Sequence, residues 1–353
     1  MDAETPIATL ADVRVPLAVA EGLEGRREGA YLRCDLHLAD GRIVAEPTGG
    51  PSRAMGGAIA LPGFVDCHTH LDKGQIWARK ANPDGTFNGA LTSVAEDRTA
   101  RWTEEDVATR MAFMLESAYA HGSVAVRTHI DSGDHRTASS WAAFAAARET
   151  WRGRITLQAA ALTVLDDVES EDYRALADLV AGHGGILGAV TYPMPDLDAR
   201  LDIFLRLASE RGLDVDFHVD ETLDPASNTL ERIALAVMRN RFQGRVLCGH
   251  CCSLSTMAET DATRTIARVA EAGLSVVSLP LCNLYLQDRH AGRTPRLRGV
   301  TLVHELAAAG VPVAFASDNT RDPFYAYGDL DMIEVMRQAT RIGHLDHSRA
   351  DWT

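Results

Sequence analysis

The sequence predicts one large α/β barrel of the (β/α)8 type behind a small β layer, and three observations lead to this prediction. Eight short apolar runs rich in β-branched residues recur along the chain, with helical patterns between several of them. The runs are continuously apolar, as in parallel strands that are buried on both faces. Polar residues gather where the runs end, as they do at the active-site face of a barrel. A doubly wound open sheet is the alternative.

The predicted elements follow in chain order. The strands are expected at 58–70, 123–131, 155–164, 185–193, 213–221, 245–252, 274–283 and 311–319. Helical patterns fill 103–122, 263–273 and 301–310, and the first of these opens with Thr103 as N-cap and ends at a glycine. Residues 1–57 hold short strand-like pieces with a turn at Asp40–Gly41, so we expect a separate β layer there and the barrel over 58–353.

The amino-acid composition limits which binding partners and which cellular compartment can be expected. The chain has 353 residues, of which 46% are hydrophobic, which is enough for a large core. Its formal net charge of −14 argues against nucleic acid or an anionic membrane as partner. No run of apolar residues is long enough to span a membrane, and the first residues lack the pattern of a signal peptide. We therefore expect a cytoplasmic protein.

Polar side chains at the ends of the predicted strands suggest a metal site. His68 and His70 are two residues apart, so on a strand they point to the same face. His218 and Asp318, each at the end of a later strand, could add a third imidazole and a carboxylate. Three histidines and one aspartate with an open position describe a hydrolytic Zn or Fe site.

The stretch Cys248–Cys251, C-G-H-C, has the spacing of a redox dithiol. A redox cysteine needs exposure at a helix N-terminus, where its pKa is lowered. Cys248 instead lies inside an apolar strand, and alternation puts it on the same face as His250. We interpret Cys248 as core and His250 as a catalytic residue.

Five stretches resemble one known family. LPGFVDCHTHLDK, HVDE, GHCCS, LPLCNLYLQDR and ASDNTRDPFYAYG are similar to motifs of the cytosine deaminase group of the amidohydrolase superfamily, in the family's order, over about residues 55–345. The resemblance implies one divalent metal ion held by the four residues His68, His70, His218 and Asp318. It also implies that Glu221 is the proton shuttle and that His250 polarises or orients the attacking water.

The implied function is metal-dependent hydrolytic deamination of an amino-substituted N-heterocycle. A metal-activated water would attack the carbon that carries the exocyclic amine. Asp318 would accept the water proton, and Glu221 would protonate the ring nitrogen before ammonia leaves. The predicted strand 185–193 has no lysine that could bridge two ions, so we expect a single ion, and these ligands suit Zn and Fe equally.

Departures from the family pattern bear on the substrate. Val164 stands where cytosine deaminases carry a glutamine that reads the pyrimidine edge, and Asn319 replaces their second acid. Lys73 resembles the triazine-type aminohydrolases of the group, and Gln287 is a further candidate for substrate contact. The substrate class therefore stays open among cytosine-like pyrimidines, purines, pterins and triazines.

The resemblance also implies possible homo-oligomers, and the chain ends at Thr353, before the C-terminal strands that the family adds to its N-terminal layer. Three other functions are considered. The first is a cyclic amide hydrolase or alkylamine-releasing amidohydrolase on the same scaffold. The second is a metal-free barrel that serves as a binding module. The third is a thiol oxidoreductase that uses Cys248 and Cys251.

Overall fold

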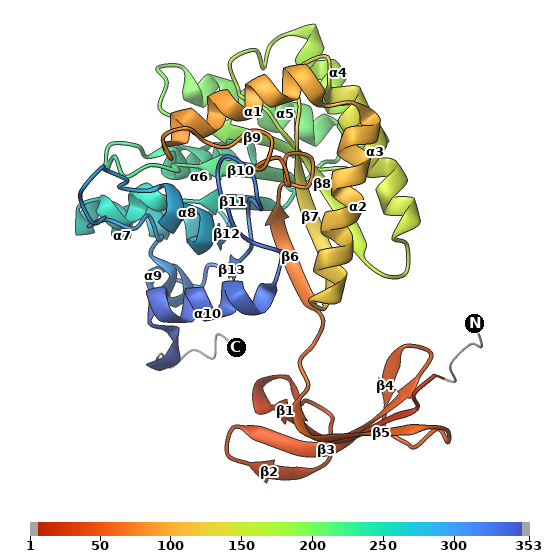
Figure 1. Ribbon diagram of the computed structural model, residues 1–353. Helices are drawn as coiled ribbons and strands as arrows, with labels where there is room; N and C mark the ends of the chain where they lie inside the picture. The colour runs from red at the N-terminus through yellow and green to blue at the C-terminus, as the bar shows by residue number, and fades with distance from the viewer. Residues whose placement is uncertain (1–5, 348–353) are drawn as a thin grey trace. The chain divides into compact units, whose positions relative to one another are not determined.

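The computed structural model describes residues 6–347, and the chain divides into two compact units. The first unit extends to Gly63, and the second runs over Phe64–Asp346 (Figure 1). The predicted boundary between the β layer and the barrel lay at residue 57. Within residues 6–347, no helix is both long enough and apolar enough to cross a membrane.

The first unit is a five-stranded sheet around a small core of Val13, Val15 and Leu36. Its elements are β1 (Thr9–Pro16), the 3-10 turn Leu17–Val19, β2 (Arg26–Glu28), β3 (Tyr31–Ala39), β4 (Arg42–Val44) and β5 (Ser52–Ile59). β3 and β4 form an antiparallel hairpin. Asp40 and Gly41 both have positive φ, as a two-residue hairpin turn requires, so the predicted turn is present.

The second unit contains eight parallel strands. They are β6 (Phe64–Thr69), β7 (Ser123–Asp131), β8 (Thr156–Leu162), β9 (Leu187–Thr191), β10 (Val215–Val219), β11 (Val246–His250), β12 (Ser275–Ser278) and β13 (Val313–Phe315). β6, β7 and β8 pair in that order, and so do β9 to β13. Isolated parallel bridges connect the β8 and β9 segments and link Thr69 of β6 to Asp318 after β13. This order is that of a TIM-like α/β barrel.

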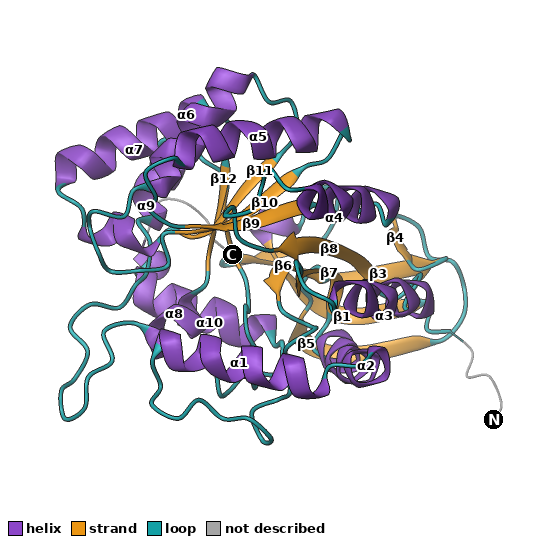
Figure 2. Ribbon diagram, turned by 90° about the horizontal axis from the view of Figure 1, so that it is seen from above, coloured by secondary structure: helices purple, strands orange, loops and turns teal. Residues whose placement is uncertain are grey.

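Helices cover the outside of these strands (Figure 2). They are α1 (Phe87–Arg101), α2 (Glu104–Ala120), α3 (Thr137–Thr150), α4 (Glu171–Gly182), α5 (Leu197–Glu210), α6 (Thr229–Asn240), α7 (Glu259–Glu271), α8 (Pro280–Leu286), α9 (Val303–Ala308) and α10 (Met332–Gly343), with 3-10 turns at Cys252–Thr256 and Leu345–His347. Thr103 caps α2 by accepting a hydrogen bond from the Asp106 amide, as predicted. The main core lies between these helices and the strands, with Trp141, Phe204 and Phe217 among its largest fully buried side chains.

One predicted strand is corrected by the structure. The run 274–283 was expected to be extended throughout, but β12 stops at Ser278 and α8 begins at Pro280. Proline is favoured at the first position of a helix because it has no amide hydrogen to lose and its φ is already helical. This change matters for the site, because it places Asn283 on a helix.

Candidate active site

The four predicted metal ligands converge from three places in the second unit. His68 and His70 come from the end of β6, and His218 belongs to β10. Asp318 follows β13, where its backbone amide donates to the His68 carbonyl at 2.9 Å. Asp318 has φ of 65°, a left-handed conformation that aspartate tolerates better than most residues.

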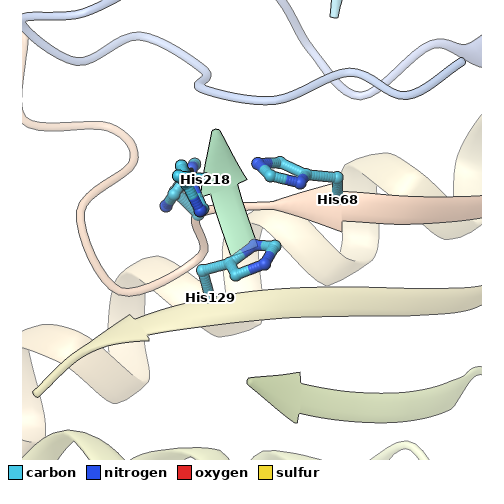
Figure 3. A group of neighbouring side chains, drawn as sticks. His68, His129 and His218 are labelled. Carbon is cyan, nitrogen blue, oxygen red and sulfur yellow. Dashed lines mark hydrogen bonds between the residues drawn. The ribbon is translucent and has the colours of Figure 1, made fainter. Parts of the chain in front are cut away.

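The side chains of these residues point at one another. Nε2 of His70 lies 3.3 Å from Nε2 of His218 and 3.2 Å from Oδ1 of Asp318. Nε2 of His68 lies 3.6 Å from the same Asp318 oxygen. Figure 3 shows His68, His129 and His218 directed toward a shared centre from three different strands.

The donor atoms of this cluster suit a divalent metal ion. Both ring nitrogens of His68 and both Asp318 carboxylate oxygens are buried without a hydrogen-bond partner in the protein. Burial, together with the neighbouring imidazoles, holds the pKa of His68 and His218 well below the usual range, so both rings are neutral and able to ligate. Burial also raises the pKa of Asp318 to about 8. A buried carboxylate beside neutral imidazoles, with none of these groups paired to a fixed cation, is the chemistry of a metal site.

A fourth histidine lies in the same cluster. The potential ligand atoms of His68, His70, His129 and His218 all come within 4.8 Å of one another. His129 Nε2, however, lies 3.1 Å from Oδ1 of Asp216, and its Nδ1 lies 3.3 Å from the Thr69 carbonyl. We interpret His129 as a support beneath the ligands, because its Nε2 lies close to the Asp216 carboxylate, although neither of these two atoms has a hydrogen-bond partner in the protein. The sequence left its role open between support and ordinary polar packing.

Glu221 lies just after β10, with its carboxyl group inside the site. Glu221, Cys282 and Asp318 offer potential ligand atoms within 4.8 Å of one another. Burial and then the charge of Asp318 raise the pKa of Glu221 well above its usual range. The side chain is only 15% exposed, which agrees with this effect of burial.

The C-G-H-C stretch serves the site through its histidine and its glycine. Cys248 and Cys251 are both buried, and burial raises the pKa of each thiol well above its usual range, which does not suit redox chemistry. His250 ends β11, as predicted, and lines the cavity described below. A Cβ on Gly249 would come within 2.9 Å of the His68 ring, so only glycine lets that ring lie against β11.

Asp66 is a functional position that sequence reasoning missed. Its carboxylate accepts hydrogen bonds from the Ser317 amide at 3.1 Å and from the Ser317 hydroxyl at 2.5 Å. The pair joins the strand that carries His68 to the segment that carries Asp318. A signal was present, since Asp66 lies two residues before His68 and therefore shares its side of β6.

A cavity of about 1560 Å³ opens beside the cluster. Its inner end, beside the cluster, is lined by His70, His218, Glu221 and His250. Apolar residues that line the rest include Leu91 of α1 and Leu176 of α4. Three of the four predicted substrate contacts also line the cavity: Lys73, Val164 and Asn319.

The fourth predicted contact, Gln287, lies behind Glu221, where its Nε2 donates to the Glu221 carbonyl at 3.3 Å.

Two of these cavity residues already have partners within the protein. The Lys73 ammonium lies 2.6 Å from Oδ1 of Asp131, and its nitrogen lies 5.5 Å from the centre of the Phe324 ring. Asn319 donates from Nδ2 to the Asp322 carboxylate at 2.7 Å. Val164 differs from them, because its side chain is apolar and 43% exposed.

Comparisons with known proteins place the chain. Residues 140–351 match the model of the amidohydrolase family. A pterin deaminase from Rhizobium rhizogenes is 52% identical over 345 residues, which cover 96% of this chain and 79% of the relative. A second relative, an N-isopropylammelide isopropyl amidohydrolase from Pseudomonas, is 24% identical over 79% of this chain and 67% of its own length.

A solved structure of a deaminase is also similar to this chain. The 5-methylcytosine deaminase from Klebsiella pneumoniae, liganded with 5-fluorocytosine, superposes with a TM-score of 0.78 at 26% identity and covers 95% of this chain and 81% of its own. The resemblance predicted from the motifs is confirmed. The chain belongs to the amidohydrolase family.

Proposed function

We propose that this amidohydrolase is a metal-dependent hydrolytic deaminase whose N-heterocycle is a pterin. The relatives support the class of reaction that the sequence predicted. This reaction is hydrolysis of a C–N bond other than a peptide bond, with deamination of an N-heterocycle. The choice of a pterin rests on the 52% identical relative. The structural observation that carries the proposal is the set of neutral imidazoles and the buried carboxylate of Asp318 next to the protonatable acid Glu221.

His68, His70, His218 and Asp318 would hold one divalent ion, Zn or Fe. Strand β9 carries no lysine that could bridge a second ion, which supports a single one. The ion would supply Lewis acidity, which makes water nucleophilic at neutral pH. His129 would stay outside the ligand set, since its Nδ1 contacts the Thr69 carbonyl and its Nε2 lies 3.1 Å from the Asp216 carboxylate.

The protein's own groups would move the protons. Water adds to the ring carbon that carries the amine, the C–N bond breaks, and ammonia leaves while a carbonyl remains. Asp318 would take the proton from water, and Glu221 would give its proton to the ring nitrogen and help the amine leave. The raised pKa of Glu221 favours this role, because the acid must be protonated at the start.

The cavity supports a substrate with two fused rings. Its volume lies above the usual range of about 300–1000 Å³ for small-molecule sites, so a bicyclic pterin fits with room to spare. Lys73, Val164 and Asn319 would line the ring. Val164 offers no hydrogen bond where cytosine deaminases carry glutamine, which favours a ring other than cytosine.

The test is ammonia release from a panel of pterin, cytosine, guanine and an aminotriazine, with protein whose metal content is measured. The proposal expects the highest kcat/KM with pterin and loss of activity in Glu221→Gln. Preference for another ring would overturn the pterin assignment. Release of an alkylamine from N-isopropylammelide in place of ammonia from any ring would favour the activity named for the second relative.

A further inference from the structure

We propose that Asn283 on α8 is a positioning residue that sets the proton positions of both Glu221 and His250, and that Gln287 fixes the Glu221 backbone from the same helix face. The inference rests on the proposed function and deepens it. It gives Gln287, which the sequence suggests as a candidate for substrate contact, a different role.

Asn283 lies within α8, and Gln287 is the C-cap residue that follows the helix, with its backbone amide donating to the Asn283 carbonyl at 2.9 Å, so the two side chains lie about one turn apart. Leu281, Leu284 and Tyr285 occupy the opposite face and line a separate cavity of about 430 Å³. The face with the amides is turned toward the active site, because both of its side chains contact Glu221. A seven-residue helix thus places two hydrogen-bond donors against one catalytic residue.

The Asn283 amide contacts both catalytic groups at once. Its Nδ2 lies 3.0 Å from Oε1 of Glu221 and 3.2 Å from Nδ1 of His250. An amide nitrogen carries two hydrogens, which matches these two acceptors. Asn283 is 1% exposed, so no bulk water competes for them.

This geometry fixes the tautomer of His250. If Nδ1 accepts from Asn283, the ring proton of the neutral imidazole must be on Nε2. The Nε2 atom is buried without a partner in the protein, and His250 lines the cavity. His250 then offers one N–H donor to an oxygen that arrives there.

The same amide selects an oxygen of Glu221. Asn283 donates to Oε1, so in the protonated acid Oε1 is the accepting oxygen and Oε2 carries the proton. Gln287 holds the residue from behind through the Glu221 carbonyl. Gln287 itself is packed tightly, because a Cβ on Gly299 would come within 2.4 Å of its Cγ, and Gly299 has a φ of +66°. The loop that carries Gly299 can approach the Gln287 side chain this closely only because residue 299 is glycine.

The direct test is the tautomer of His250 in the zinc-loaded protein without substrate. Long-range proton–nitrogen NMR correlations of protein labelled with ¹⁵N-histidine distinguish an Nε2–H ring from an Nδ1–H ring. The His250 signals are assigned by their absence in His250→Gln. We expect Nε2–H. An Nδ1–H ring would overturn the proposal, because Asn283 would then accept through Oδ1.

Asn283→Asp provides the second test, since an aspartate of the same shape accepts where the amide donates. We expect the ring to change to Nδ1–H and kcat for pterin to fall on the order of 10²–10⁴-fold, as for other catalytic histidines held in the wrong tautomer, with KM within about threefold. Unchanged kcat, or a lower kcat with an unchanged tautomer, would contradict the inference. Gln287→Met should lower kcat about 10-fold without altering the tautomer.

Tyr285→Phe is the matched control on the opposite face of α8 and should change neither readout. The two proposals fail in different ways. If the wild-type protein releases no ammonia from pterin, the proposed function fails. The tautomer measurement uses no substrate, so it still tests the positioning role of Asn283.

Discussion

Two sets of buried polar groups that belong to the active site differ in how their hydrogen-bonding needs are satisfied. In the first set, nitrogen and oxygen atoms of His68 and Asp318 are buried without partners. Two other buried groups of the cavity lining are paired within the protein: Lys73 with Asp131, and Asn319 with Asp322. Buried polar atoms without a partner cost folding free energy unless a ligand binds to them, whereas groups that are paired within the protein need no ligand. The unpaired groups therefore indicate that a ligand belongs beside them, whereas the paired groups give no such indication.

The comparison predicts its largest effect at the cluster that contains the unpaired groups. His218→Ala removes one imidazole from the cluster, and we expect loss of bound metal together with a fall of activity to background. Metal content by plasma mass spectrometry and ammonia release are measured on the same preparation. Asn240→Ala, on the exposed side of α6, is the control. Full metal content in His218→Ala would mean that His129 can replace it as a ligand.

Glu221→Gln should have the next largest effect. It keeps the shape and removes the proton, so kcat should fall about 10²–10⁴-fold, the range of a general acid. The metal content should remain that of the wild type, which separates this variant from the ligand variant. Activity within tenfold of wild type would require another proton donor.

A smaller effect is expected from Lys73→Met, at one of the paired groups. Asp131 would keep only Arg98, whose Nη1 lies 3.2 Å from its Oδ2. Breaking one side of a buried ion pair should lower the free energy of unfolding by about 3 kcal/mol, measured by urea denaturation. Lys73→Met combined with Asp131→Leu should restore much of that loss. If stability is unchanged but KM for pterin rises, Lys73 acts on the substrate and the paired state is secondary.

Val164→Gln should have the smallest effect on stability, within about 0.5 kcal/mol, because the side chain is 43% exposed. It places at the cavity wall the amide that cytosine deaminases use. We expect the ratio of kcat/KM for cytosine to that for pterin to rise about tenfold, by the value of one added hydrogen bond. No change in this ratio would remove Val164 from the substrate contacts.

Much of the fold could be predicted because parallel strands buried on both faces leave a clear pattern. All eight predicted runs contain a strand, and β7 occupies the same residues as predicted. The error at 274–283 arose because a helix of seven residues, PLCNLYL, is too short to show helical periodicity in an apolar run. The N1 proline was the available signal.

The convergence of the four proposed metal ligands could be predicted because alternation on β6 and the order of the strand ends bring these residues together. The roles of His129, Asn283 and Gln287 could not, since they depend on distances between side chains on different elements. His129 is separated from the ligand role by its contact with Asp216, 87 positions later in the chain, and no local pattern encodes that contact.

The bond between Ser317 and Asp66 joins residues that are 251 positions apart. During synthesis, His68 and His70 leave the ribosome long before the segment that carries Asp318 exists. The ligand set can be completed only when nearly the whole second unit has been translated, since contacts this distant in sequence form late. Binding of a metal ion to the proposed ligand set would then come late, and a chain interrupted before residue 317 would present the histidines without the Asp318 carboxylate.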